Sequence, residues 1–174
     1  MAARTELLQT ISLIGMPGAG KSTVGVILAK LTGLRFVDTD VDIQVREGAT
    51  LQEIIEKEGH LRLRAIEEDV LLAIDLDRAI ISTGGSVIYS EPVMKRLAAA
   101  GPLVYLDVGL ATLQERVAAA PLRGIACHAS QTYADVYAER TPLYRRYADL
   151  TVDAALGCAD DVAAEILRHL RKKS

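Results

Sequence analysis

Short apolar runs alternate along the chain with longer segments in which apolar residues recur every three or four positions. The short runs are typical of buried strands and the longer segments of amphipathic helices. Strands are therefore predicted at residues 10–14, 34–37, 79–82, 103–107 and 150–152. Because strands and helices alternate, the pattern favours an α/β fold with a mainly parallel sheet and helices on both faces.

The helices are predicted from apolar faces with i, i+3, i+4 and i+7 spacing. These faces are Val24, Ile27, Leu28 and Leu31; Leu63, Ile66, Val70 and Ala73; and Ala163, Ile166, Leu167 and Leu170. Residues 40–58 are predicted to form a helix that is broken by a turn at 47–50, and residues 112–117 begin a further helix. Residues 132–140 are also predicted to be helical, after which Thr141 is expected to cap a separate helix with Pro142 in its first turn.

A long segment without periodicity, residues 118–131, lies between two of these helices. It contains Pro121, Gly124 and His128. A loop of this length inside a compact domain is usually functional or mobile. We therefore expect it to take part in function or to move.

Size and charge narrow the class of protein. A chain of 174 residues suits a single domain, here residues 1–174, and its formal net charge of −3 offers no basic face for a nucleic acid. Cys127 and Cys158 lack the spacing of a metal or redox site, and no apolar run approaches the length of a membrane span. We expect a cytoplasmic monomer with no membrane or nucleic-acid partner.

The clearest motif follows the first predicted strand, where residues 15–23 read G-M-P-G-A-G-K-S-T and match the P-loop pattern G-x-x-x-x-G-K-[ST] in full. Glycines let backbone N–H groups point at phosphate oxygens, and the following helix N-terminus adds positive charge. The expected nucleotide ligands are Gly15, Gly18, Ala19, Gly20, Lys21, Ser22 and Thr23. Lys21 is expected to reach the β- and γ-phosphates and Ser22 to bind Mg²⁺, so ATP and Mg²⁺ are the predicted cofactors. A glycine-rich turn with an incidental lysine is the alternative, but the strand before the motif and the helix after it argue against that.

A pair of carboxylates stands at the carboxyl end of the second predicted strand, where ligands bind in open α/β sheets. The run is Asp38-Thr39-Asp40, and extended geometry would place Asp38 and Asp40 on one side. One carboxylate can hold Mg²⁺ through water while the other accepts the proton of an attacking hydroxyl. Equally, Asp40 can simply cap the following helix.

Further polar residues have two interpretations each. Arg64 can belong to a ligand site or form a solvated pair with Glu68 four residues on. The paired glycines of the run Thr83-Gly84-Gly85-Ser86 permit close approach of a ligand, or form a plain turn. Arg140 can likewise be a ligand or a surface charge.

The order of these motifs resembles the shikimate kinase family over about residues 11–152. It is carried by G-M-P-G-A-G-K-S-T, D-T-D, E-G-H-L-R-L-R-A-I-E-E, T-G-G-S and E-R-T-P-L-Y-R-R-Y-A-D. The resemblance implies a three-layer P-loop NTPase fold with a five-stranded parallel sheet. It also implies an acceptor-binding helical segment at about residues 38–64 and a mobile lid at about residues 118–131.

The resemblance assigns roles by position. Asp38 would assist Mg²⁺, and Asp40 would hold the acceptor hydroxyl. Arg64 and Arg140 would grip the carboxylate of shikimate. Gly84 and Gly85 would line the acceptor pocket, and Arg116 would lie near the adenine.

Two departures from the family pattern lie on the acceptor and lid side. Ser86 stands where the family usually has the third of three glycines, so its side chain would enter the pocket wall or donate a new hydrogen bond. Ala120 stands where the family usually has a lid arginine that contacts the transferring phosphate. Arg123, three residues later, is the expected substitute and is counted with Lys21 and Asp40 as catalytic.

The implied function is ATP-dependent phosphorylation of shikimate to shikimate 3-phosphate. A related kinase for another hydroxy acid such as homoserine, which pairs a carboxylate with a primary hydroxyl, is one alternative, and the Arg64–Arg140 pair favours an acceptor with a carboxylate. A nucleotide-binding regulatory protein with little kinase activity is another. Ala120 favours this second alternative, whereas Lys21, Ser22, Asp38 and Asp40 argue against it.

Overall fold

A five-stranded parallel sheet forms the centre of the molecule, whose computed structural model describes residues 10–121 and 124–172. The strand order is β2-β3-β1-β4-β5. The strands are β1 (Ile11–Ile14), β2 (Arg35–Asp38), β3 (Ala79–Ser82), β4 (Leu103–Asp107) and β5 (Leu150–Asp153). The expected α/β fold with five parallel strands is therefore confirmed, and all five strands lie at or within one residue of their predicted positions.

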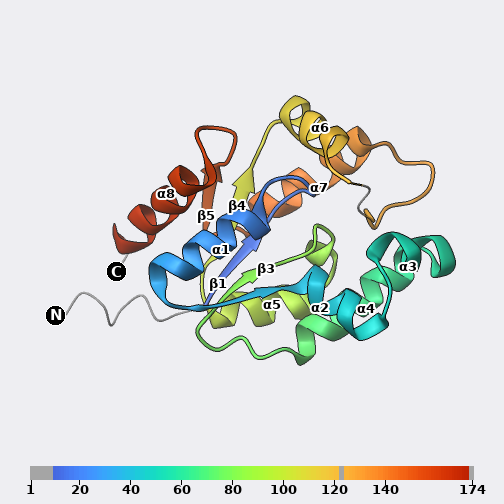
Figure 1. Cartoon of the computed structure of the whole chain (residues 1–174), viewed down its shortest axis with the longest axis horizontal. Coiled ribbons are helices and arrows are strands. Elements are labelled where there is room, and N and C mark those ends of the chain that lie inside the picture. Colours follow the sequence, from blue (N-terminus) through green and yellow to red (C-terminus); the bar gives the residue numbers. More distant parts are fainter. Residues whose placement is uncertain (1–9, 122–123, 173–174) are drawn as a thin grey trace.

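Helices cover both faces of this sheet (Figure 1). They are α1 (Lys21–Thr32), α2 (Thr39–Glu47), α3 (Leu51–Glu58), α4 (His60–Ala73), α5 (Glu91–Ala100), α6 (Leu110–Ala119), α7 (Tyr133–Tyr147) and α8 (Ala159–Lys172), with a 3₁₀ turn η2 (Val87–Tyr89). α1 and α8 pack together on one face, and α5 and α7 lie on the other. The segment α2–α4 projects beyond the carboxyl ends of β2 and β3, which places it beside the P-loop.

Two cores hold these layers. The large one surrounds β1, β3 and β4, whose side chains are almost all fully buried. A smaller apolar cluster ties α2, α3 and α4 to the loop before α7 through Ile43, Ile54, Leu63, Ile66 and Ala126. The acceptor-binding segment expected from the sequence thus has a core of its own and packs against part of the loop at 118–131.

Local signals explain where the helices of that segment begin and end. α2 ends at Gly48, whose φ of 63° is left-handed and open to glycine at no steric cost. α3 begins with a capping box, in which Thr50 and Glu53 each accept from the other's backbone N–H. The predicted break at 47–50 is therefore confirmed.

The prediction of two helices around Thr141 was wrong. α7 runs without interruption from Tyr133 to Tyr147, begins with a capping box between Thr132 and Asp135, and contains Pro142 in its interior. An interior proline costs about 3 kcal/mol or more. Burial of Val136 and Tyr144 on one face of the helix offsets that cost.

Other differences are smaller. α5 was not predicted, although Ser90 accepts from the backbone N–H of Val93 and a proline stands in the first turn. Leu31 and Ala73, expected on buried helical faces, are exposed. None of the helices that the structure describes is long and apolar enough to cross a membrane.

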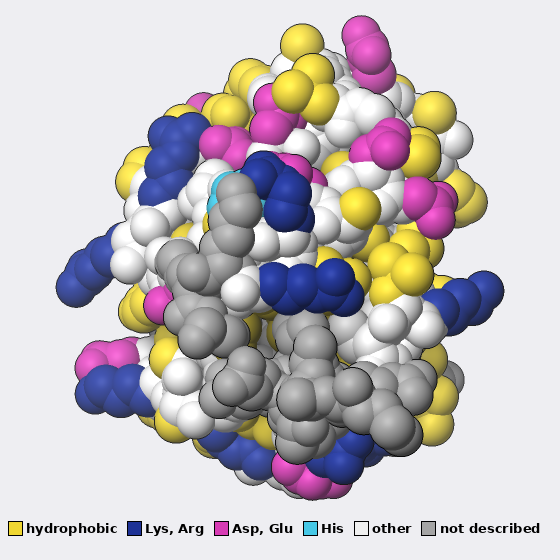
Figure 2. Space-filling view, turned by 90° about the vertical axis from the view of Figure 1, so that its left-hand side faces the viewer, with side chains coloured by type: hydrophobic (Ala, Val, Ile, Leu, Met, Phe, Trp, Pro, Cys, Tyr) yellow, Lys and Arg dark blue, Asp and Glu magenta, His cyan; other side chains and the backbone are white. Residues whose placement is uncertain are grey.

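Charged side chains of both signs lie on the face that carries the chain ends (Figure 2). Among the described residues on that face, acidic side chains lie mainly in the upper part of the view, and Lys and Arg side chains are scattered over its middle and edges. The residues predicted to bind ligands instead lie at the carboxyl edge of the sheet, close to α2–α4.

Candidate active site

The P-loop connects β1 to α1 and curls around the buried ammonium of Lys21. Gly18 and Gly20 have φ angles of 87° and 95°, a region that side chains other than glycine's disfavour. Lys21 Nζ donates to the carbonyls of Gly15 at 2.8 Å and Met16 at 2.9 Å, and the residue is 8% exposed. The loop therefore presents one cation and a series of backbone N–H groups at the start of α1.

The residues fit a nucleotide with its metal ion. Gly20 caps α1 without any side-chain hydrogen bond, and an added Cβ at Gly20 would meet nothing within 4 Å, which leaves the helix N-terminus open to an anion. Ser22 Oγ lies 3.3 Å from Ser82 Oγ at the end of β3. Among the described residues no group of three or more metal-binding side chains occurs. Such a sparse set suits Mg²⁺, which keeps several waters and takes its other ligands from phosphate oxygens.

Asp38 and Asp40 do not lie on the same side of one extended strand, as the sequence had predicted. Asp38 ends β2 and caps α2, where its Oδ1 accepts from the N–H of Asp40 at 3.1 Å. Asp40 lies in the first turn of α2, and the chain turns between the two carboxylates. The capping role suggested for Asp40 therefore belongs to Asp38, and Asp40 faces Gly84 across the site, its Oδ1 only 3.0 Å from the position a Cβ would take there.

Arg64 and Arg140 converge on one oxygen atom. Arg64 Nη2 donates to the carbonyl of Ala126 at 3.1 Å, and Arg140 Nη2 donates to the same carbonyl at 2.5 Å. Both guanidinium groups also lie over the ring of Tyr89, at 4.0 and 5.5 Å from its centre. The surface ion pair of Arg64 with Glu68 is not what the structure has, whereas the neighbouring Arg62 does form an exposed pair with Glu58.

The loop at 118–131 contributes this shared carbonyl. Gly124 packs so closely on the start of α3 that a Cβ there would lie 2.6 Å from the backbone of Leu51. Ala120, which stands where the family usually has a lid arginine, directly follows α6. Arg123 lies outside the described residues.

The glycines after β3 form the wall between these groups. A Cβ at Gly85 would lie 3.0 Å from Arg140 Nη1 and 2.9 Å from Pro17 of the P-loop. Tyr144 donates its hydroxyl hydrogen to the carbonyl of Gly85, and Tyr133 donates to Pro17 at 2.6 Å. α7 therefore fixes both the wall and the P-loop while it supplies Arg140.

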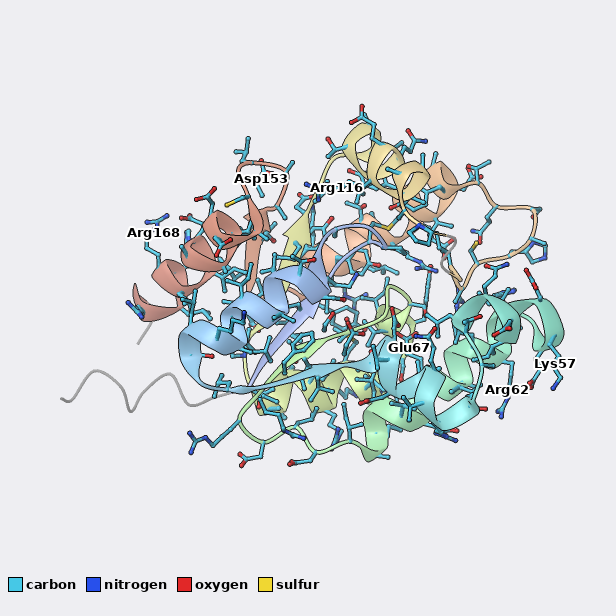
Figure 3. All side chains as sticks on the ribbon, in the orientation of Figure 1. Lys57, Arg62, Glu67, Arg116, Asp153 and Arg168 are labelled. Carbon is cyan, nitrogen blue, oxygen red and sulfur yellow. The ribbon has the colours of Figure 1, made fainter. Side chains whose placement is uncertain are left out.

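Glu67 is a site residue that the sequence analysis missed. It lies on α4 within the apolar face formed by Leu63, Ile66 and Val70, and it is 4% exposed. Figure 3 shows it inside the molecule, beneath the carboxyl edge of the sheet, while Arg62 on the same helix points outward. A carboxylate in the middle of an apolar helical face was the signal that could have found it.

Ser86 accounts for part of the surroundings of Glu67. Its hydroxyl donates to Glu67 Oε2, which confirms the second of the two outcomes expected for this departure. The other oxygen, Oε1, is buried and has no hydrogen-bond partner in the described part of the chain. The same holds for the buried Nε atoms of Arg64 and Arg140.

The electrostatics of the site follow from burial. Burial lowers the pKa of Lys21 to about 8, although Asp40, Asp38 and Glu67 oppose that change. Burial also raises the pKa of Glu67 to about 7; the hydrogen bond from Ser86 and the charges of Arg140 and Lys21 oppose the rise, and Asp40 adds to it. The site thus holds three buried charged groups, Lys21, Glu67 and Arg140, beside the half-buried carboxylates of Asp38 and Asp40.

Arg116 lies on the other side of the P-loop, at the end of α6 (Figure 3). It donates to the carbonyl of Ala154 at 3.1 Å and lies 3.5 Å from that of Ala19. It therefore borders the P-loop on the side away from Asp40 and Arg64.

Comparison with known proteins gives one consistent result. A model of the shikimate kinase family matches residues 17–171. Shikimate kinase 2 of Enterobacter sp. (strain 638) is 38% identical over 170 residues, 95% of this chain and 97% of that protein. Shikimate kinase of Mycobacterium tuberculosis (strain ATCC 25177 / H37Ra) is 37% identical over 93% of each chain. A solved structure, shikimate kinase from Acinetobacter baumannii in complex with shikimate, is similar with a TM-score of 0.85 and 33% identity over 96% of this chain and 95% of that one.

Proposed function

This chain belongs to the shikimate kinase family, and we propose that it transfers the γ-phosphoryl group of ATP to a hydroxyl of shikimate, giving shikimate 3-phosphate and ADP. The family match favours shikimate as the acceptor, and one observation of the structure supports a carboxylate on it. The guanidinium groups of Arg64 and Arg140 converge on a single oxygen, and their Nε atoms remain without partners in the described residues. Such a pair is built to bind a carboxylate, because charge-assisted hydrogen bonds to two guanidinium groups are roughly twice as strong as neutral ones.

ATP binding is assigned to the P-loop residues Gly15, Gly18, Ala19, Gly20, Lys21, Ser22 and Thr23. The backbone N–H groups hold the phosphates and Lys21 the β- and γ-oxygens. Ser22 and Asp38 would hold Mg²⁺, which would neutralise charge on the phosphate oxygens. The position of Arg116 beside Ala19 supports a contact with the nucleotide base or sugar on that side.

The acceptor is held from three directions. Arg64 and Arg140 bind its carboxylate, so that a carboxylate oxygen takes the place of the Ala126 carbonyl. Asp40 accepts the hydrogen of the reacting hydroxyl. Gly84 and Gly85 let the ring approach the chain, because a side chain at either position would collide with Glu67 or Pro17.

The reaction follows from this arrangement. The acceptor oxygen attacks the γ-phosphorus and its proton passes to Asp40, while the bond from the γ-phosphorus to the bridging oxygen breaks and ADP leaves. Lys21 stabilises the charge on the transferring group. Positioning and charge stabilisation supply most of the effect in phosphoryl transfer, so no covalent enzyme intermediate is needed.

Several further assignments remain predictions from the sequence. They are the acceptor-binding segment at residues 38–64, the lid at 118–131, the single domain over 1–174, the cytoplasmic location and the monomeric state. The role of Arg123 as the phosphate ligand that replaces Ala120 also rests on the sequence alone.

A substrate panel tests the proposed function. ADP release is measured with shikimate, homoserine and other small hydroxy acids, and the product is identified by ³¹P NMR. We expect kcat/KM for shikimate to exceed that for homoserine by at least about 10³-fold, because buried carboxylates that lack a hydroxyl partner penalise a poor fit. Faster turnover of homoserine, or no turnover of any acceptor, would reject the proposal in favour of the corresponding alternative.

A further inference from the structure

Ser86 occupies a buried position at the end of the glycine wall. It is 6% exposed, and its φ of −93° and ψ of 0° are open to any residue, so nothing in the backbone requires glycine there. Its hydroxyl donates to Oε2 of Glu67, which comes from α4 on the opposite side of the wall. The contact joins two segments that are far apart in the sequence.

The second oxygen of Glu67 lies over Gly84. A Cβ at Gly84 would collide with Glu67 Oε1 and lie 3.0 Å from Asp40 Oδ1, so both carboxylates border the space that this glycine keeps open. Oε1 is buried and has no hydrogen-bond partner among the residues described. A buried carboxylate oxygen without a donor is costly unless a ligand supplies one.

We propose that Ser86 is a positioning residue for acceptor binding, which holds one oxygen of Glu67 so that the other accepts a hydrogen bond from a hydroxyl of the acceptor. The torsion of a terminal carboxylate is broad, so Glu67 alone has no fixed orientation. A hydrogen bond to one oxygen removes that freedom and sets the other oxygen beside Asp40. This inference rests on the proposed function and adds a residue to it that replaces a family glycine.

The same hydrogen bond affects the charge of Glu67. The groups that face this carboxylate are Asp40 from α2, Arg140 from α7 and Lys21 from α1. Burial raises the pKa of Glu67 to about 7, and the Ser86 hydroxyl opposes that rise because it donates to the charged form. Loss of the hydroxyl therefore leaves a larger fraction of Glu67 protonated at neutral pH, and a protonated oxygen is a poorer acceptor.

The test compares Ser86→Ala with the conservative Ser86→Thr, which keeps a hydroxyl. Ser12→Ala is the matched control, because Ser12 is a fully buried serine on β1 whose hydroxyl has no partner in the described part of the chain. We expect Ser86→Ala to raise the KM for shikimate about three- to tenfold and leave the KM for ATP unchanged. The acid limb of its kcat/KM profile should move to higher pH by about half a unit or more. Ser86→Thr should restore both values to within twofold of wild type.

Two further measurements keep the inference falsifiable if Ser86→Thr does not fold. In a Glu67→Gln background, Ser86→Ala should no longer move the acid limb. The carboxyl ¹³C resonance of Glu67, assigned by its loss in Glu67→Gln, should titrate at higher pH in Ser86→Ala than in wild type. An unchanged resonance, or an unchanged shikimate KM, would overturn the inference. A wild-type protein that does not phosphorylate shikimate would overturn the proposed function instead, while the resonance would still report whether Ser86 holds Glu67.

Discussion

The nucleotide side and the acceptor side of this site are built in opposite ways. The P-loop is one continuous segment, residues 15–23, and it offers mainly backbone N–H groups and one lysine. The acceptor side is assembled from α2, α4, the glycine wall and α7, and it offers side chains: Asp40, Glu67, Arg64 and Arg140. Only the folded chain brings these four together.

This difference has a consequence for how each side tolerates change. Backbone groups stay in place whatever side chains surround them, so the phosphate site depends on a short local sequence and its glycines. A site made of side chains changes its chemistry with a single substitution. Ser86 and Ala120, the two departures discussed above, both lie outside the P-loop, and Ser86 contacts Glu67 on the acceptor side.

The largest effect is expected at the nucleotide side. Lys21→Ala removes the one buried cation of the P-loop, and charge that stabilises the transferring phosphoryl group is worth about 10³-fold or more in kcat. With both substrates saturating, the rate of ADP release should decrease by at least that factor. The circular dichroism spectrum should stay that of wild type. If turnover were unchanged, the P-loop would not be the reacting site.

The next effect concerns Arg123, whose role rests on the sequence. Arg123→Ala should lower kcat on the order of 10³-fold if this arginine replaces the one missing at Ala120. The thermal midpoint should change little. A decrease of less than about threefold, worth well under 1 kcal/mol, would mean that Arg123 is a solvated loop residue.

A stability measurement tests the buried environment of Glu67 on the acceptor side. The pKa of Glu67 is raised from 4.5 to about 7 in the folded protein, so the folded state binds the proton more tightly than the unfolded state. The free energy of unfolding of wild type should therefore fall as the pH rises from about 4.5 to 7, by about 2–3 kcal/mol relative to Glu67→Gln. Urea titrations across this range measure the difference. Glu68→Gln, which removes a carboxylate from the next position of α4, is the control, and a constant offset between wild type and Glu67→Gln would contradict the assigned environment.

The smallest effect separates recognition from chemistry. Arg64→Lys keeps the charge and loses the planar fork that two acceptor oxygens require, so the KM for shikimate should rise about tenfold. The KM for ATP should not change. Arg62→Lys, two positions away on the same helix and paired with Glu58 at the surface, is the matched control. Equal KM values for shikimate in the two variants would return Arg64 to the class of surface arginines.

Much of the fold could be predicted because its signals are local. Short apolar runs predicted the strands, and the turn predicted at 47–50 contains Gly48, whose φ is left-handed in the structure. The single helix α7 could not be predicted in this way. Pro142 is an unfavourable local signal, and the burial of Tyr144 that outweighs it becomes visible only in the packed structure.

The site residues likewise fall into those with a local sequence signal and those whose contacts depend on the folded chain. The P-loop was complete from its sequence, because backbone geometry and spacing carry its chemistry. The partners of Arg64 were not predictable, because Ala126 is 62 residues away and contributes a carbonyl that every residue possesses. Glu67 was overlooked although its spacing from Leu63, Ile66 and Val70 places it on the apolar face of α4, and its burial separates it from the neighbouring Glu68.

The oxygen that Arg64 and Arg140 share is the main-chain carbonyl oxygen of Ala126, so substitution of that residue cannot remove it. A codon change at Ala126 replaces a methyl group and leaves that oxygen in the polypeptide. Under the proposed function, exchange of either arginine weakens binding of the acceptor's carboxylate. Variation can therefore reach this contact mainly by moving the backbone, whose course depends on Gly124 against Leu51, where any added Cβ would collide. Selection that changes this contact is therefore expected to act on Gly124 and not on Ala126, whose carbonyl oxygen accepts the hydrogen bonds.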